Sequence, residues 1–236
     1  MVYGKELNKR SPLRVFERSI HGGLGKGNVG VMTSRKGVGK TAVLIGVALD
    51  DLLQDRKVLH VTVGGSVEHL SNFYEEIFRD LAASSKIEDL AETRLIMVKN
   101  RHLLSYRDAD FSLNRIRESM KFLAEHAAFE PYAVILDGWP DFETVRDEEL
   151  AELKQLAKDA NVEIWITALR HREGQERDER DVPLEVARHD KHLSVIVRLE
   201  PKADHVKLRI VKDHENDNLS DLHIQLDAKT LLLKWG

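Results

Sequence analysis

The stretch from residue 29 to residue 47 constrains this chain more than any other. An apolar run at residues 29–33 leads into a loop, and an apolar helical pattern begins directly after it. The loop and the residue after it read Ser34, Arg35, Lys36, Gly37, Val38, Gly39, Lys40, Thr41 and Ala42. Glycines let a backbone turn tightly with its N–H groups facing inward, in conformations that a side chain would block. A strand, a loop ending in Gly-Lys-Thr and a helix, in that order, predict a loop that binds phosphate groups.

Each position of this loop has an expected role. Lys40 would bring a mobile positive charge to the β- and γ-phosphates, and the Thr41 hydroxyl would be a ligand of Mg²⁺. The backbone from Ser34 to Ala42 would surround the phosphates, and the following helix would point its positive end at them. Ser34 stands where this motif usually has glycine or alanine, which is a small departure. A chance Gly-Lys-Thr in an ordinary strand-to-helix turn is the weaker alternative.

A second position with expected chemistry follows another apolar strand. Residues 132–136 form a continuous apolar run that stops at Asp137. A buried parallel strand carries its last residue to the C-terminal edge of the sheet, beside the glycine loop. We therefore expect the Asp137 carboxylate to hold Mg²⁺, directly or through water. An aspartate that only ends a strand is common, and the loop upstream is what favours the metal role.

Composition bounds the class of protein. The 236 residues, 42% hydrophobic and 32% charged, fit one α/β domain with a solvated surface. The net charge of −4 gives no support for nucleic acid as a partner, although a local basic patch stays open. The absence of cysteine excludes disulfides, thiolate zinc sites and cysteine catalysis. Without a signal-like start or a run long enough to cross a bilayer, we expect a cytoplasmic protein with no membrane contact.

The pattern of elements predicts the architecture. Strand and helix patterns alternate, which indicates a mostly parallel central sheet flanked by helices on both faces. Strands are expected at 29–33, 57–63, 94–98, 132–136 and 163–168, and helices from Pro12 and at 41–54, 66–84, 111–129 and 147–160, with a polar loop at 100–110. Three further strand-like runs, 194–200, 205–211 and 222–227, leave no room for helices and predict a C-terminal antiparallel extension. Residues 1–12 are expected to be flexible and 13–236 to form a single domain.

These features together resemble a known superfamily. The run from His21 to Thr41, the strand ending in Asp137, and Val211-Lys212-Asp213-His214 in the closing β-rich segment are similar to the RecA-like ATPases. Within that superfamily the chain is most similar to the KaiC and RadA proteins and to the DnaB-type helicase motor domain. The resemblance extends from about residue 13 to the end, and the glycine loop, a Walker A motif, is its most specific part. It implies a RecA-like P-loop NTPase fold, ATP with Mg²⁺ as cofactors, and a homo-oligomeric ring or filament.

In such assemblies the nucleotide lies between subunits, and a lysine or arginine near the end of a late strand reaches the neighbour's γ-phosphate. Lys212 matches that lysine by location, so the resemblance implies that Lys40 and Lys212 are catalytic. The arginine often found two residues later is here His214. A solvated charge at the end of a strand is an equally weighted interpretation of Lys212.

Two departures from the family pattern bear on hydrolysis. The glutamate that activates water after the second strand is here Gly64, and the polar pair of the fifth strand is Thr167-Ala168. Loss of a general base costs about 10²- to 10⁴-fold in rate and leaves ground-state binding largely intact. Glu68 is a weak candidate to replace the base. The sequence therefore supports nucleotide binding more firmly than turnover.

Other charged residues favour ordinary surface roles. The segment 170–181 lies where related motors carry a DNA-facing loop, but its acidic residues match or outnumber its basic ones, which favours a solvated loop. His189 and His192, with Asp190 between them, have a spacing found in metal sites, yet two histidines on a charged segment are usually surface residues.

Four functions are therefore weighed. The favoured hypothesis is an ATP-binding protein of the KaiC and RadA type that acts as a nucleotide-dependent assembly or switch, with weak or absent hydrolysis. The second is an active DNA-dependent ATPase or recombinase accessory protein, which needs a base and a basic DNA path. The third is a P-loop small-molecule kinase, disfavoured by the closing antiparallel strands. The fourth is a scaffold that has lost nucleotide binding, disfavoured by the intact loop and Asp137.

Overall fold

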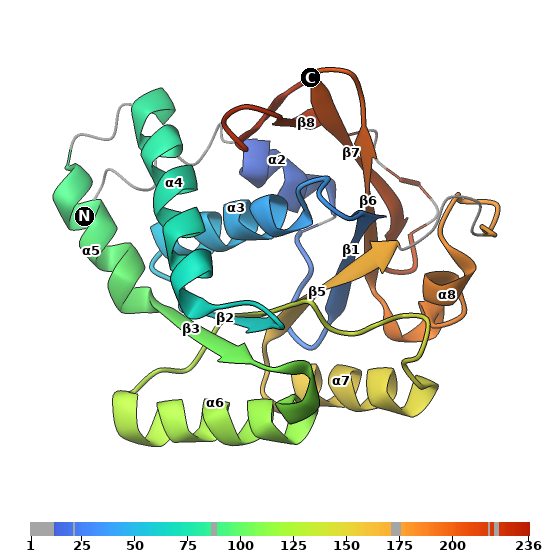
Figure 1. Cartoon of the computed structure of the whole chain (residues 1–236), viewed down its shortest axis with the longest axis horizontal. Helices are drawn as coiled ribbons and strands as arrows, with labels where there is room; N and C mark the ends of the chain where they lie inside the picture. Colours follow the sequence, from blue (N-terminus) through green and yellow to red (C-terminus); the bar gives the residue numbers. More distant parts are fainter. Residues whose placement is uncertain (1–11, 21, 86–88, 171–175, 217, 220–221) are drawn as a thin grey trace.

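The computed structural model describes residues 12–20, 22–85, 89–170, 176–216, 218–219 and 222–236, and over these residues it forms a nine-stranded sheet with helices on both faces (Figure 1). The strands are β1 (Val29–Arg35), β2 (Val58–Val63), β3 (Arg101–Tyr106), β4 (Ala133–Asp137), β5 (Glu163–Arg170), β6 (Val195–Pro201), β7 (His205–Asp213), β8 (Ile224–Asp227) and β9 (Leu233–Trp235). The helices are α2 (Pro12–Ser19), α3 (Lys40–Leu53), α4 (Val67–Ser85), α5 (Leu90–Asn100), α6 (Leu113–Ala127), α7 (Asp147–Asp159) and α8 (Leu184–Ala187), with 3-10 turns η1 (Asp108–Asp110) and η2 (Asp190–His192).

The strand order of the sheet is β3-β2-β4-β5-β1-β6-β7-β8-β9. The pairs from β3 through β6 are parallel, and the pairs β6–β7, β7–β8 and β8–β9 are antiparallel. The expectation of an α/β fold with a mostly parallel sheet and a C-terminal antiparallel extension is thus confirmed. Since β5 lies between β1 and β4, the C-terminal ends of these three strands meet at one edge of the sheet.

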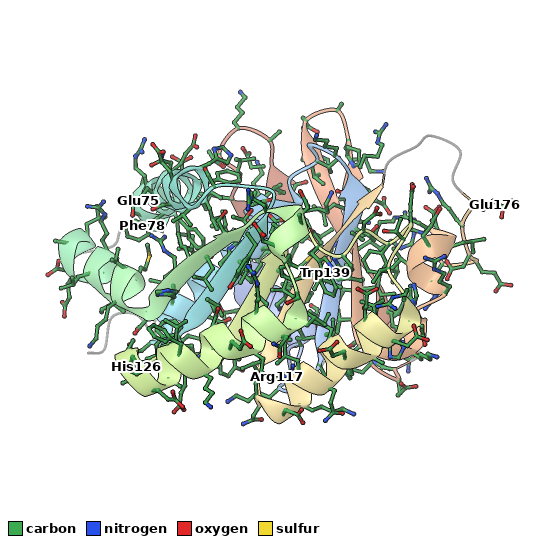
Figure 2. The ribbon with its side chains drawn as sticks, turned by 60° about the horizontal axis from the view of Figure 1, so that its bottom comes forward. Glu75, Phe78, Arg117, His126, Trp139 and Glu176 are labelled. Carbon is green, nitrogen blue, oxygen red and sulfur yellow. The ribbon has the colours of Figure 1, made fainter. Side chains whose placement is uncertain are left out.

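The sheet separates the helices into two layers, and a hydrophobic core lies between the sheet and each layer. Helices α2, α3, α4 and α5 pack on one face of the sheet, where Leu44, Leu49 and Tyr74 are fully buried. Helices α6 and α7 pack on the other face through Ile116 and Leu153. Figure 2 shows α6 and α7 side by side, where Arg117 of one reaches Glu152 of the other at 3.6 Å.

The region between α4 and α6 corrects the sequence interpretation. Residues 94–98 were expected as a strand, but they lie within α5, where the Asp89 carboxylate accepts a hydrogen bond from the Glu92 N–H at 2.9 Å and caps the helix. The apolar run misled because it is not buried as a strand would be: Leu95 is 68% exposed and only Met97 and Asn100 of α5 are buried. The segment 100–110, expected as a polar loop, instead contains β3. This edge strand is half-buried, and its sequence lacks the long apolar run by which a strand is predicted.

The remaining predictions can be placed against these elements. The helix expected from residue 66 is α4, and Ser66 caps it, since its Oγ accepts a hydrogen bond from the His69 N–H at 3.1 Å. Strand β9 was not predicted. The expected flexible segment 1–12 lies outside the described residues apart from Pro12, which begins α2.

Candidate functional site

The loop between β1 and α3 is bent around two glycines with left-handed backbone conformations. Gly37 has φ of +78° and Gly39 has φ of +111°. A Cβ atom built at Gly39 would lie 2.5 Å from Cδ2 of Leu226 in β8, which is closer than any real contact, whereas a Cβ at Gly37 would meet no described atom within 4 Å. A side chain at position 39 would therefore be strained by the backbone conformation and would have to displace the end of the Leu226 side chain.

The loop presents backbone donors at the start of α3. Among the described residues, none accepts a hydrogen bond from the N–H groups of Gly37, Val38 or Gly39. The Gly39 carbonyl, in contrast, accepts a hydrogen bond from the Val43 N–H at 3.0 Å. The N-terminus of a helix carries a partial positive charge in addition. Free N–H groups at such an end form a site suited to an anion.

Lys40 is folded back over the strand that precedes the loop. Its ammonium donates to Ser34 O at 3.2 Å, Ser34 Oγ at 3.3 Å and Arg35 O at 3.2 Å, and the residue is 9% exposed. Burial lowers the pKa of Lys40 to about 8, and the Asp137 carboxylate acts in the opposite direction. Within the described residues its hydrogen-bond partners are all neutral oxygen atoms, so the positive charge has no directly bonded carboxylate.

Asp137 connects the glycine loop with the middle of the sheet. Its Oδ2 accepts a hydrogen bond from the Thr41 hydroxyl at 2.6 Å, and its Oδ1 accepts one from the Thr167 hydroxyl at 3.0 Å. Thr167 Oγ1 in turn accepts a hydrogen bond from the Gly138 N–H at 3.0 Å. The residues expected to hold the metal, Thr41 and Asp137, are therefore in direct contact although 96 positions separate them.

The Thr41 and Asp137 oxygens are the ligand type that Mg²⁺ prefers, and Mg²⁺ completes its shell with water and phosphate oxygens. In the part of the chain that the structure describes, no group of three or more histidine, cysteine, aspartate or glutamate residues has metal-binding geometry. The pair fits a Mg²⁺ ion whose other ligands are water or phosphate oxygens, and does not fit an all-protein cage.

The positions at which the sequence departs from the family pattern lie at the same edge. Gly64 follows β2 with φ of +76°, and Thr167 belongs to the Asp137 network while Ala168 is buried beside it. Glu68 lies exposed in the first turn of α4. The sequence interpretation missed Asp108, whose carboxylate lies against Gly64. Only the pairing of β2 with β3 brings that residue here.

Lys212 lies away from the glycine loop and is paired within the chain. Its ammonium bonds Asp190 O at 2.7 Å and Asp190 Oδ2 at 2.6 Å. Burial acts to raise the pKa of Asp190, but hydrogen bonds from Lys212 and Arg180 hold it below its ordinary value. His214 is turned toward the segment before β1, where its Nε2 is 3.0 Å from Leu24 O.

The charged segment 170–181 pairs its own charges where it is described. Arg180 bonds the Asp178 carboxylate at 2.7 Å, and Arg177 pairs with Asp181; residues 171–175 lie outside the described residues. His189 and His192 both approach Asp147 Oδ1, at 3.2 and 3.0 Å, and Lys191 approaches its other oxygen. These hydrogen bonds hold the pKa of Asp147 well below its usual range.

Comparison with known proteins adds no family. No protein-family model matches the sequence, and no curated protein matches it. Within the described residues, the structure contains no helix that is both long and apolar enough to cross a membrane. The class that fold and site define is an α/β protein with a glycine loop and an aspartate meeting at the C-terminal edge of a mostly parallel sheet.

Proposed function

We propose that this chain is a RecA-like P-loop protein that binds ATP with Mg²⁺ between the glycine loop and Asp137. The observation that supports this best is the 2.6 Å hydrogen bond between the Thr41 hydroxyl and Asp137. It joins a helix-terminal hydroxyl to a strand-terminal carboxylate, and both are oxygen ligands of the kind that Mg²⁺ takes alongside phosphate. The loop N–H groups that have no acceptor among the described residues, together with the Lys40 ammonium, supply complementary donors for the phosphates.

A nucleotide-dependent assembly or switch with slow or absent hydrolysis is the activity that we propose. Gly64 carries no base, so the chemical step lacks a carboxylate from β2. The assembly is proposed to be a homo-oligomer in which Lys212 reaches a neighbour's nucleotide. Because Lys212 is bonded to Asp190, it has to leave that partner when it acts on a neighbour.

Binding of labelled ATP to the wild type, with and without Mg²⁺, tests the site. Lys40→Ala is expected to weaken binding at least about 100-fold, which corresponds to about 2.7 kcal/mol, because the main cationic donor is lost. Asp137→Asn is expected to reduce the gain in affinity on adding Mg²⁺. Lys121→Ala, which removes an exposed lysine of α6, is the matched control and is expected to bind as the wild type does. A wild type that binds no ATP, or binding that ignores Lys40→Ala, contradicts the proposal.

Mass measurement in solution tests the assembly. We expect a higher mass with ATP and Mg²⁺ than without nucleotide, and a loss of this difference in Lys40→Ala. The same mass under all conditions would contradict the oligomer.

A further inference from the structure

Gly64 at the end of β2 has a carboxylate beside it that comes from another strand. A Cβ atom built at Gly64 would lie 3.3 Å from Oδ2 and 3.7 Å from Oδ1 of Asp108. Asp108 begins η1, two residues after the end of β3. Its carboxylate therefore occupies the space that a side chain at position 64 would enter.

Two hydrogen bonds fix the end of β2 against the end of β3. The Gly64 N–H donates to Tyr106 O at 2.9 Å, and the Ser105 hydroxyl donates to Gly65 O at 2.6 Å. Gly64 also has a positive φ that other residues rarely adopt. The local backbone is thus arranged for a bare position 64 with Asp108 next to it.

The Asp108 carboxylate lies at the same edge of the sheet as Asp137. Thr62 of β2 is in register with Asp137 of β4, and Gly138 approaches β2 so closely that a Cβ there would lie 2.3 Å from Val63 O. Two strand spacings separate β3 from β4, and Asp108 lies two residues beyond the end of β3, so the Cα atoms of Asp108 and Asp137 are on the order of 10 to 15 Å apart. Strand β2 lies between β3 and β4, and Gly64 places no side chain at its end.

Asp108 is also chemically available. Among the described residues, none forms a hydrogen bond or an ion pair with its side chain, and the residue is exposed. Asp110 in the same turn differs, because Arg107 Nε donates to its carboxylate at 2.6 Å. Of these two carboxylates, Asp108 is the one without a bonded partner among the described residues.

We propose that Asp108 is the general base for ATP hydrolysis in this chain, in place of the side chain that Gly64 lacks. The inference rests on the proposed function. As the water oxygen forms its bond to the γ-phosphorus, Asp108 accepts a proton from the water, and the bond from the γ-phosphorus to the bridging oxygen breaks. The bridging oxygen keeps the electron pair and leaves with ADP, and the proton passes from Asp108 to solvent.

The test measures ATP affinity and phosphate release separately in Asp108→Asn, which keeps the shape and removes the base. The rate is expected to fall about 100-fold or more, with the dissociation constant of ATP within about twofold of the wild type. Asp110→Asn, from the same turn, and Glu68→Gln, the other candidate base, are matched controls expected to retain the wild-type rate. Lys40→Ala sets the background, because only release that depends on Lys40 is counted.

Several results would overturn the assignment. If Asp108→Asn hydrolyses ATP at the wild-type rate, Asp108 is not the base. If the rate falls in Glu68→Gln alone, the base is Glu68 of α4. A wild type that binds ATP but shows no Lys40-dependent release refutes the inference and leaves the binding proposal intact. A wild type that does not bind ATP refutes the proposed function itself.

Discussion

The two ends of α3 carry charges of opposite sign, and each charge lies at the helix end whose partial charge has the same sign, which is unfavourable. Lys40 lies at the positive N-terminal end, and Asp50 and Asp51 are buried near the negative C-terminal end. At the C-terminal end, Arg56 bonds the Asp51 carboxylate at 3.0 Å, and this ion pair offsets part of the free-energy cost of a buried negative charge there. At the N-terminal end the Lys40 ammonium bonds only neutral oxygen atoms among the described residues, and the Asp137 carboxylate is bonded by Thr41, so Lys40 itself has no bonded anion.

The ionised form of Asp51 remains unfavourable at the C-terminal end of α3. Burial raises the pKa of Asp51 to about 8, with Glu163 acting in the same direction and Arg56 against it. Glu163 likewise has a pKa raised by burial, and its Oε1 accepts hydrogen bonds from the Gly25 N–H and the Tyr132 hydroxyl, both at 3.1 Å. Both ends of α3 are therefore sensitive to protons, but only the N-terminal end is suited to an anionic ligand.

The largest expected effect concerns pH at the C-terminal end. Between the unfolded pKa of Asp51, about 3.8, and the folded value of about 8, the folded chain binds the extra proton. Stability therefore falls as pH rises through this window, by up to about 1.4 kcal/mol per pH unit. Asp51→Asn is expected to flatten the dependence of the unfolding free energy on pH between 5 and 8, measured with urea. Asp159→Asn, at the exposed end of α7, is the control; parallel curves for Asp51→Asn and the wild type would refute this account.

The second prediction concerns the bend that precedes α3. Gly39→Ala is expected to destabilise the fold by about 2–3 kcal/mol, because a positive φ and the overlap with Leu226 both oppose a side chain. Gly37→Ala has the strained φ without the overlap, and we expect about 1 kcal/mol. Chemical unfolding of both, with and without Leu226→Ala, measures the contact. Equal costs in the two glycine variants would show that Leu226 plays no part.

The smallest expected effect concerns the N-terminal charge. Lys40→Met is expected to raise the stability of the nucleotide-free protein at pH 7 by about 1 kcal/mol, because a desolvated cation is removed from the positive end of a helix. The folded pKa of Lys40, about 8, is below the ordinary value of 10.5, so the wild type gains stability as pH rises between these values. The advantage of the variant should therefore shrink toward pH 10. Lys121→Met is the control, and a clear loss of stability in Lys40→Met would mean that its hydrogen bonds to Ser34 and Arg35 dominate.

The sequence was sufficient to predict the elements that are determined by a few neighbouring residues. The glycine loop, the helix after it and the strand ending in Asp137 follow from patterns read over a few residues, and the contact of Thr41 with Asp137 follows from parallel strands ending at one edge. The sheet with its antiparallel extension was predictable for the same reason.

Local patterns failed where burial and pattern disagree. The apolar residues of α5 are largely exposed, and β3 is a half-buried edge strand, so neither shows the periodicity of its class. Asp108 could not be found because its relation to Gly64 depends on the pairing of β2 with β3. The Lys212 pair with Asp190 likewise joins residues 22 positions apart through tertiary structure.

The contact between Leu226 and Gly39 has a consequence for deletion mapping. A shortened chain that ends before β8 would lose the outer edge of the sheet and, with it, the side chain against which the turn at Gly39 rests. Loss of ATP binding in such a fragment would then report a loosened turn more than 180 residues upstream, so shortened chains cannot by themselves assign a nucleotide contact to the last hairpin.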